Sequence, residues 1–524
     1  MHWSRWGDPD HTTTLPAGAT DLMALAFGEI TPRPAVPLAA VVARLPTLAP
    51  DVADRLAAVV GADHLTTDLS DRVHHTRGKS TPDLLAARSG DFSDAPDAVV
   101  RPGNDEEVVA VLQVCAAHGV AVVPYGGGTS VVGGLVADRA ELHGLVSLDL
   151  CRLDALVDLD EVSRTATLQA GMLGPQAETL LGERGYTLGH FPQSFEFASI
   201  GGFAATRSSG QSSSGYGRFD SMVVSVTVAT ARGLWSVGAA PASAAGPDLR
   251  QLVLGSEGAL GVITDVTVMV RPVPAEKVYE TWRWESFEAG AQAMRTLVQD
   301  DLNPTVLRLS DETETSINLS DPSAIGLSDA GGAQMVCGYE GSADRVARMR
   351  AEVAATLRAA GGQLAGEDGG AAWSDGRFAA PYLRDALLDE GVLVETLETA
   401  TVWSNLRHLY DEVLAAVTSA ATRQGTDPLI LCHISHVYRA GASLYFTVAM
   451  RESDDGIRQW APVKRAAGDA IRAAGGTITH HHAVGRDHKP WLADEIGVPG
   501  VAVLRAAKQA LDPEGVLNPG VLVP

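Results

Sequence analysis

The sequence predicts an α+β protein of two parts, and three observations lead to this fold class. From residue 97 onward, short apolar strands alternate with helical runs. Three glycine-rich stretches, at residues 123–134, 189–223 and 254–272, interrupt this alternation. The composition shifts at residues 272–276, and the strand–helix units beyond that point are typical of an antiparallel sheet covered by helices on one side.

Residues 1–91 are predicted to form an N-terminal arm. Its first 50 residues are irregular, with one or two short helices, and Trp3 and Trp6 suggest a lead-in that docks on the body of the protein. Residues 51–60 predict a helix. Residues 69–85 are polar and rich in turn formers, so that a solvated loop and a loop beside a ligand both fit them. This stretch holds a small basic patch of His74, His75, Arg77 and Lys79.

The first folded part is expected to span residues 92–275. Asn104 is a predicted N-cap, because it precedes acidic residues and then apolar residues at helical spacing that continue toward Gly119. A second helix is expected at residues 173–184. Strands are expected at residues 98–101, 120–123, 144–149, 165–170, 223–230 and 262–270.

The second part is expected to span residues 276–505, followed by a C-terminal segment, residues 506–524, that returns to the first part. Strands are predicted at residues 278–284, 305–309, 335–339, 429–436 and 443–450. Helices are predicted at residues 286–299, 342–360, 406–424, 457–474 and 499–511, the last with Pro499 in its first turn.

Composition excludes several classes of protein. The 524 residues carry a formal net charge of −24, which argues against nucleic acid or an anionic membrane as the main partner. Four scattered cysteines without a CxxC pair suit a reducing cytoplasm. We find neither an apolar run long enough to span a membrane nor a signal-peptide core at the N-terminus. We therefore expect a cytoplasmic protein.

The first glycine-rich stretch, VPYGGGTSVVGG at residues 123–134, follows a predicted strand. Glycine allows close approach of the backbone to a ligand, and successive exposed N–H groups in such a turn suit a diphosphate. No Gly-Lys-Ser/Thr follows, so it is not a Walker loop, and its glycines do not open a helix as a dinucleotide fingerprint requires. The second stretch has almost no periodicity, and a loop of that length within a packed region is usually functional.

Taken together, the motifs PYGGGTS (124–130), QSFEFASIGG (193–202), ATRSSG (205–210), GSEGALGVIT (255–264) and LDPEGVLNPG (511–520) resemble the flavoproteins of the vanillyl-alcohol oxidase type. The resemblance covers about residues 60–524. It implies a two-part FAD-binding domain of the PCMH type and an α+β cap domain over the flavin. Some members tether FAD through a histidine in the glycine loop; Thr129 stands at the matching place, so non-covalent FAD is implied. The implied cofactor-binding residues are Pro124, Tyr125, Gly126, Gly127, Gly128, Thr129, Ser130, Gln193, Ser194, Phe195, Glu196, Phe197, Ala198, Ser199, Thr206, Arg207, Ser208, Ser209, Ser256, Glu257, Gly258, Ala259, Leu260, Gly261 and Val262.

Two branches of this fold compete for the cap. The FAD-linked D-2-hydroxyacid dehydrogenases carry a histidine-rich metal motif, which residues 432–447 lack. The alkyldihydroxyacetonephosphate synthases are more similar, through YRAGASLYF (438–446), HHHAVG (480–485) and YLRDALLDEGVLVETLETATVW (382–403). Ala483 departs from that pattern, where the family usually has glycine. The resemblance implies exchange of the acyl group of acyl-dihydroxyacetone phosphate for a fatty alcohol, through a covalent adduct at flavin N5 and without net redox change. An FAD-linked oxidase or dehydrogenase of a D-2-hydroxy acid or alcohol is the alternative, and a binding protein is a third.

Tyr445 matches the family's tyrosine and is the candidate general acid/base. We expect neighbouring cations to help this phenol titrate at neutral pH. His480, His481 and His482 assist it or shuttle protons themselves, and at most two of them should face one substrate, because an extended segment alternates its faces. A packed strand tyrosine, a structural histidine run and a metal site are the competing interpretations. We expect no metal, because no cysteine or acidic partner stands at matching spacing.

Arg384 is the candidate for binding phosphate or carboxylate, since a guanidinium offers paired planar donors. The alternative is an exposed helix arginine paired with Asp385 or Asp389. Arg308 is a second anion-binding candidate, against a structural salt bridge. His190 precedes the 193–199 stretch, and both packing and a role in the site fit it. Lys79 could reach a phosphate too. The expected partners are the small lipid-phosphate substrate and a fatty alcohol; peripheral membrane contact and a homodimer stay open.

Overall fold

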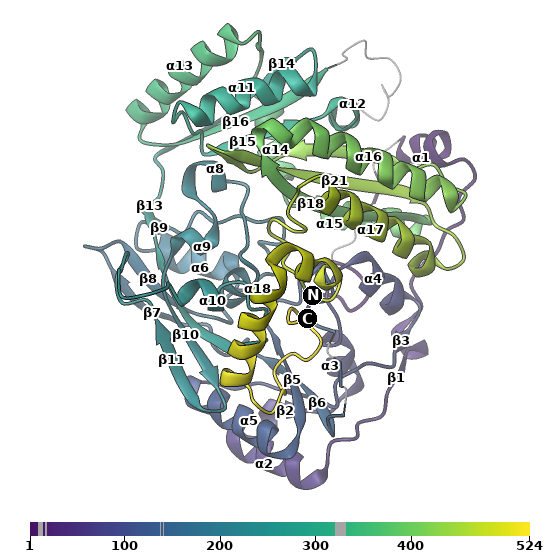
Figure 1. The fold of residues 1–524 in the computed structure, drawn as a ribbon, viewed down its shortest axis with the longest axis vertical. Helices are drawn as coiled ribbons and strands as arrows, with labels where there is room; N and C mark the ends of the chain where they lie inside the picture. The colour runs from purple at the N-terminus through teal and green to yellow at the C-terminus, as the bar shows by residue number, and fades with distance from the viewer. Residues whose placement is uncertain (9–13, 16–17, 137, 140, 320–331) are drawn as a thin grey trace.

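The structure is a computed structural model that describes the chain except for residues 9–13, 16–17, 137, 140 and 320–331. Figure 1 shows two bodies, with the first half of the chain below and an eight-stranded sheet with its helices above. The α+β class predicted from the sequence is confirmed.

A four-stranded sheet carries the first glycine-rich stretch, in the strand order β2-β4-β6-β5. Its strands are β2 (Leu65–Thr66), β4 (Ala98–Val100), β5 (Val120–Tyr125) and β6 (Gly144–Asp149). β4, β6 and β5 are parallel, and β6 is buried along its whole length, as continuous apolar strands of parallel sheets are. Helix α5 (Asp105–His118) makes the crossover, and α2 (Pro50–Val60) packs in the same core. The Asn104 side chain accepts the Glu107 N–H at 2.8 Å, and Gly119 ends the helix in the left-handed region, as predicted.

A five-stranded antiparallel sheet lies beside it, in the order β11-β10-β12-β8-β7. Its alternating strands turn one face into a core shared with the first sheet. Its strands are β7 (Leu156–Asp160), β8 (Thr165–Gln169), β10 (Val223–Thr230), β11 (Gly233–Val237) and β12 (Val262–Met269). The short elements around these sheets are α6 (Gly174–Gly182), α7 (Ile200–Thr206), α8 (Ser213–Tyr216), α9 (Phe219–Met222), α10 (Arg250–Val253), β1 (Val42–Ala43), β3 (Asp91–Phe92), β9 (Tyr186–Thr187) and β13 (Arg271–Pro272).

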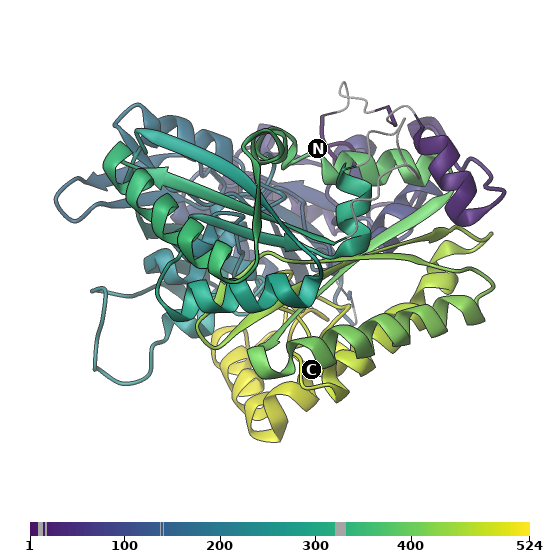
Figure 2. The same cartoon turned by 90° about the horizontal axis from the view of Figure 1, so that it is seen from above.

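The eight-stranded sheet is antiparallel, in the order β17-β14-β16-β15-β19-β21-β18, with β20 added to β21. Its strands are β14 (Glu276–Trp284), β15 (Val306–Ser310), β16 (Ala333–Gly341), β17 (Gln363–Gly366), β18 (Val392–Val402), β19 (Leu429–Ile434), β20 (Val437–Tyr438) and β21 (Gly441–Arg451). Helices cover one side of it (Figure 2) and bury apolar stripes at helical spacing in a common core. These are α11 (Phe287–Gln299), α13 (Ala343–Ala359), α16 (Leu406–Arg423) and α17 (Gly456–Ala473); α12 (Glu312–Leu319), α14 (Asp368–Gly376) and α15 (Ala380–Asp389) complete this body.

The C-terminal residues run back to the first body. Helix α18 (Lys489–Leu511) begins ten residues before the predicted one and is broken at Gly497, where φ is 72°, so Pro499 stands in the first turn of its second piece. Beyond it, Leu517 bridges Val122 of β5, and the Asn518 N–H donates to the Val122 carbonyl at 2.8 Å. Among the described residues no helix is both apolar enough and long enough to traverse a bilayer.

Of the two interpretations left open for residues 69–85, the solvated loop is wrong. The stretch holds α3 (Leu69–His74) and α4 (Thr81–Arg88), and Lys79 and Asp83 are buried. The Ser80 hydroxyl caps α4 by accepting the Asp83 N–H at 3.1 Å, and the Thr81 N–H donates to Glu395 at 2.7 Å. The polar residues in this stretch begin a helix or lie beneath the cap, and their composition is the same as that of a surface loop. The N-terminal arm holds α1 (Ala19–Phe27) and a short helix at Leu38–Ala40, in line with the prediction.

Candidate active site

The three glycine-rich stretches meet at the end of β5. A Cβ at Gly126 would overlap the Ser199 hydroxyl, one at Gly127 the Phe197 carbonyl, and one at Gly258 the ring of Pro124. Gly128 and Gly258 also have positive φ, of 71° and 75°. Glycine is therefore needed here because segments far apart in sequence approach within backbone contact.

The polar groups around these stretches fit a ligand such as FAD. The buried Ser256 hydroxyl, Gln193 Nε2 and Asn518 Oδ1 have no hydrogen-bond partner in the described part of the chain. Buried polar atoms are nearly always paired, so a donor-and-acceptor set of this kind suits a polar ligand. The stretches thus supply tight backbone turns together with free donors and acceptors, as a diphosphate and the polar edge of a ring require.

Other predicted cofactor side chains are turned toward protein groups instead. Arg207 binds the Leu254 carbonyl at 2.9 Å, and the Thr206 hydroxyl donates to the Gly202 carbonyl at 2.9 Å. The carboxylate of Glu257 accepts the Gly485 N–H at 2.9 Å and the Val484 N–H at 3.1 Å. Each of these side chains therefore has a structural partner within the protein, and Glu257 links the FAD half to the histidine segment of the cap.

Tyr445 lies at the centre of the cap site because of the strand register. On β21 it stands opposite His433 of β19 and opposite Glu398 of β18. Directly opposite residues share one face of a sheet. The ring of His433 stacks on Tyr445 at 4.8 Å between centroids, and the rings of His481 and His482 lie at 6.0 and 5.6 Å. The register therefore brings together groups from three strands and the histidine run.

Glu398 holds the histidine run in place. Its buried carboxylate accepts the backbone N–H of His480, that of His481 at 3.2 Å and that of His482 at 2.9 Å. The next residue, Ala483, has φ 73°, a left-handed conformation that costs an alanine about 1–2 kcal/mol. Residues 480–482 form a bend rather than an extended segment, so the adjacent His481 and His482 both lie beside Tyr445 while His480 turns elsewhere. How many of them face a substrate stays a prediction.

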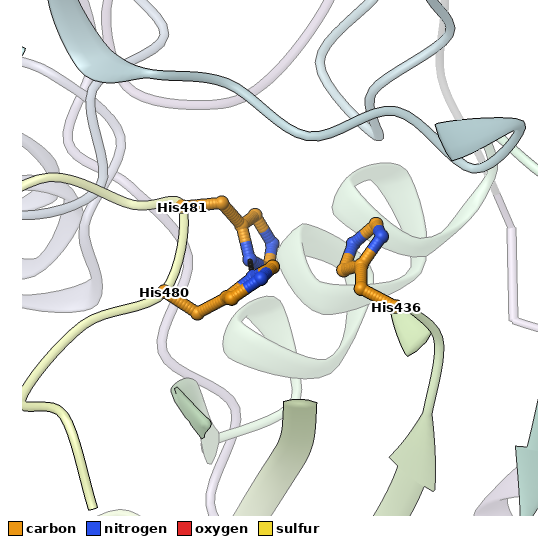
Figure 3. A group of neighbouring side chains, drawn as sticks. All are labelled: His436, His480 and His481. Atoms are coloured by element: carbon orange, nitrogen blue, oxygen red, sulfur yellow. Dashed lines mark hydrogen bonds between the residues drawn. The ribbon is translucent and has the colours of Figure 1, made fainter. Parts of the chain in front are cut away.

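His480 belongs to a second group of rings. Its Nε2 lies 2.6 Å from the Tyr438 hydroxyl and 3.1 Å from Arg218, and its Nδ1 lies 2.9 Å from His481 Nδ1. Figure 3 shows His436 from the opposite side with its ring turned toward this pair. One nitrogen from each of His436, His480 and His481 lies within 4.8 Å of the others, close enough for one metal ion. The expectation of no metal remains a prediction.

The site is built of neutral proton carriers. Burial lowers the pKa of His480, His481 and His482 to about 3 against the pull of Glu398. Burial opposes ionisation of Glu398 as well, but the adjacent histidines and the Thr479 hydroxyl outweigh it, so its pKa lies well below the usual value.

The expected activation of Tyr445 by neighbouring cations is wrong in this structure. Burial raises the pKa of Tyr445 to about 12, and the opposing effect of Arg308 is small. The surrounding imidazoles carry no charge at neutral pH, so they supply no cation to lower it. Tyr445 is therefore a neutral phenol that holds its proton.

The two predicted anion-binding arginines already have protein partners. Arg308 pairs with Glu314 and lies 3.0 Å from His433, which matches the salt-bridge alternative. Arg384 is partly buried rather than exposed; it pairs with Asp385 at 3.2 Å and donates to the Lys79 carbonyl at 2.7 Å.

His190 and Lys79 are also engaged. The ring of His190 packs between Phe203 and Phe219, and its Nε2 lies 3.0 Å from the Ser208 hydroxyl. Lys79 donates to the His2 carbonyl at 2.6 Å, and burial lowers its pKa to about 8. The position of His190 is explained by its packing between two rings, whereas Lys79 connects the first residues of the chain to the site through its bond to His2.

Sequence reasoning missed several residues of this site. They are Glu398, His433, His436, Tyr438 and Arg218. Glu398 stands in the quoted ETLETATVW motif, and an acidic residue inside an otherwise apolar strand pattern was a usable signal. Arg218 carried no such signal, because its contact with His480 joins positions 262 residues apart.

Comparison with known proteins shows the family. A model described as "FAD binding domain" matches residues 96–237, and one described as "FAD linked oxidases, C-terminal domain" matches residues 273–522. An alkyldihydroxyacetonephosphate synthase of Trypanosoma brucei brucei is 30% identical over 567 residues, which cover 100% of this chain and 92% of the relative. The chain belongs to the alkyldihydroxyacetonephosphate synthase family.

Further matches agree. The Dictyostelium discoideum synthase is 32% identical over 495 residues, which cover 91% of this chain and 81% of the relative. A solved alkyldihydroxyacetonephosphate synthase superposes with a TM-score of 0.86 at 28% identity, covering 100% of this chain and 99% of that one. The protein is an FAD-dependent enzyme of this family, and the three glycine-rich stretches lie in and just beyond its FAD-binding half.

Proposed function

We propose that this enzyme exchanges the acyl group of acyl-dihydroxyacetone phosphate for a fatty alcohol, forming an ether lipid precursor. The observation that carries the proposal is the neutral Tyr445 phenol set among neutral imidazoles on the cap face. The family assignment supports the substrate class.

The pocket residues then have separable tasks. The exchange requires a proton to leave the carbon next to the ketone and a proton to be returned to it. Tyr445 holds a proton at its hydroxyl, and His481 and His482, each neutral, have a ring nitrogen to accept one. Glu398 fixes the backbone of both histidines and so keeps their rings beside the phenol. We propose that Arg384, which also donates to the Lys79 carbonyl, binds the phosphate or the leaving carboxylate.

The glycine-rich stretches are proposed to hold FAD, with backbone N–H groups of residues 125–130 on the diphosphate. When bound, the flavin would supply the chemistry by which the acyl group at the substrate carbon is replaced by the fatty alcohol without net oxidation. Thr129 offers no ring nitrogen for a tether, so we propose that FAD is bound non-covalently. The cytoplasmic location, membrane contact and homodimer expected above stay predictions.

The test follows both halves of the exchange. Purified protein with FAD should release fatty acid from palmitoyl-dihydroxyacetone phosphate and incorporate labelled hexadecanol in equal amounts. The same preparation should not bleach with D-lactate or 2-hydroxyglutarate. Bleaching together with reduction of a dye would instead show the hydroxy-acid dehydrogenase, and neither activity would leave a binding protein.

A further inference from the structure

The N-terminal residues Met1–Gly7 lie outside both family models and form a closed turn against the site. The His2 N–H donates to the Gly7 carbonyl at 2.7 Å, and the His2 carbonyl accepts from Lys79. Gly7 has φ 84° and rests on the ring of Tyr382. The turn is therefore anchored between the FAD half and helix α15 of the cap.

Trp6 occupies the point where these parts meet. It is 3% exposed, its ring packs edge-on against Phe197 at 5.7 Å, and its backbone N–H donates to Asp385. Phe197 belongs to the second glycine-rich stretch, and Asp385 neighbours Arg384. Trp6 thus touches a predicted cofactor segment and the neighbour of the predicted anion-binding residue.

The indole N–H of Trp6 is unsatisfied. Its Nε1 is buried and has no hydrogen-bond partner in the described residues. Nearby, Arg384 Nη2 is buried and, although it is 3.2 Å from Asp385, donates no aligned hydrogen bond. Buried N–H donors left free cost stability unless a ligand accepts from them. Both donors call for oxygen acceptors. Lys79 and Arg384 supply positive charge there and Asp385 and Asp83 negative charge, so the free donors rather than the charge point to a phosphate oxygen.

We propose that the N-terminal turn completes the substrate pocket and that Trp6 donates its indole N–H to a phosphate oxygen of the substrate. Trp6 is then a binding residue that selects phosphorylated substrates. The inference rests on the proposed function, since that function brings a phosphate monoester to the Arg384 side of the site.

The test compares Trp6→Phe with Trp3→Phe in FAD-loaded protein. Phe keeps a ring against Phe197 but lacks the N–H. Trp3 is the matched control, because it lies in the same turn but packs elsewhere, with its ring edge-on to Phe92 at 5.8 Å between centroids. Affinity is measured by titration with dihydroxyacetone phosphate and with inorganic phosphate, per flavin-loaded molecule. Turnover of palmitoyl-dihydroxyacetone phosphate, flavin content and melting temperature are measured beside it.

Trp6→Phe should lower the affinity for dihydroxyacetone phosphate and for inorganic phosphate about 10- to 100-fold. This is the loss expected when a hydrogen bond to a charged group disappears. Its KM should rise while its kcat stays close to that of the unchanged protein, and Trp3→Phe should change neither. Equal affinity in both variants, or a lowered melting temperature with unchanged affinity per flavin, would overturn the proposal. If Trp6→Phe fails to load FAD, affinity is compared between Trp6→Tyr, which keeps an O–H donor, and Trp6→Leu, which has none: tighter binding by Trp6→Tyr supports the proposal, and equal affinity refutes it. An unchanged protein that binds dihydroxyacetone phosphate but exchanges no acyl group would refute the proposed function alone, whereas failure to bind would refute both.

Discussion

Replacing Tyr445 by Phe tests the central chemical assignment. The substitution removes one oxygen and keeps the ring that stacks on His433 at 4.8 Å and lies 5.6 Å from His482. If the hydroxyl were only structural, its loss would cost about 1 kcal/mol, or roughly fivefold in any affected constant. If it moves the proton, turnover should fall by roughly 10²- to 10⁴-fold. The two cases are separated by more than an order of magnitude.

The assay is incorporation of labelled hexadecanol at saturating substrate, with flavin absorbance measured on the same sample. Tyr410→Phe is the matched control, because Tyr410 is a cap tyrosine that donates to Asp311 at 3.1 Å and packs on Phe446, the residue after Tyr445. It should keep near-normal turnover. The pKa of about 12 means that Tyr445 keeps its proton up to that pH, so it should add no alkaline limb between pH 7 and 10. A loss below tenfold with full flavin content would remove Tyr445 from the mechanism.

Four further predictions follow from the same geometry. Glu398→Gln should lower turnover at least tenfold and displace the histidine run. The reason is that one amide oxygen replaces a carboxylate that accepts three backbone N–H groups. Normal turnover and an unchanged melting temperature would contradict this. Arg384→Lys should raise KM about tenfold or more with little change in kcat, because Lys cannot offer paired donors, and an unaltered KM would count against its anion role. Acid should destabilise the fold, because burial holds the pKa of five histidines at about 3: His190, His480, His481, His482 and His488. Their contribution to the free energy of unfolding is complete above the unfolded pKa of 6.5 and is lost as the pH falls toward 3. The loss is on the order of 1 kcal/mol per pH unit for each ring. Carboxyls whose pKa burial raises to about 6 or 7, among them Glu257, Asp83, Asp265 and Asp311, act in the opposite sense until the pH reaches their ordinary values near 4. The histidine effect is therefore tested between about pH 4 and 3, where a melting temperature that rises as the pH falls would refute the reasoning. Treatment with a chelator should leave activity intact, and a loss restored by Zn²⁺ would show that His436, His480 and His481 hold a metal.

The FAD-binding half was largely predictable because its determinants are local. A backbone that packs against another segment or adopts positive φ needs glycine, so this structural requirement can be recognised in the sequence at Gly126, Gly127 and Gly258. Asn104 and Gly119 mark the ends of a helix for similarly local reasons. Many strands and helices of the cap followed from apolar periodicity, which requires only neighbouring residues. Strand β18, which carries Glu398, was missed.

By itself, then, the sequence determined the α+β class, the FAD-binding motifs and the family, since each depends on short stretches of chain. Only the tertiary structure decided that Glu398 holds the histidine run, that Tyr445 stays protonated, and that Trp6 and Lys79 are buried beside Arg384. The reason is physical: strand register, burial and hydrogen-bond pairing join residues hundreds of positions apart. A polar side chain has the same appearance in a sequence whether water or another buried group is its partner.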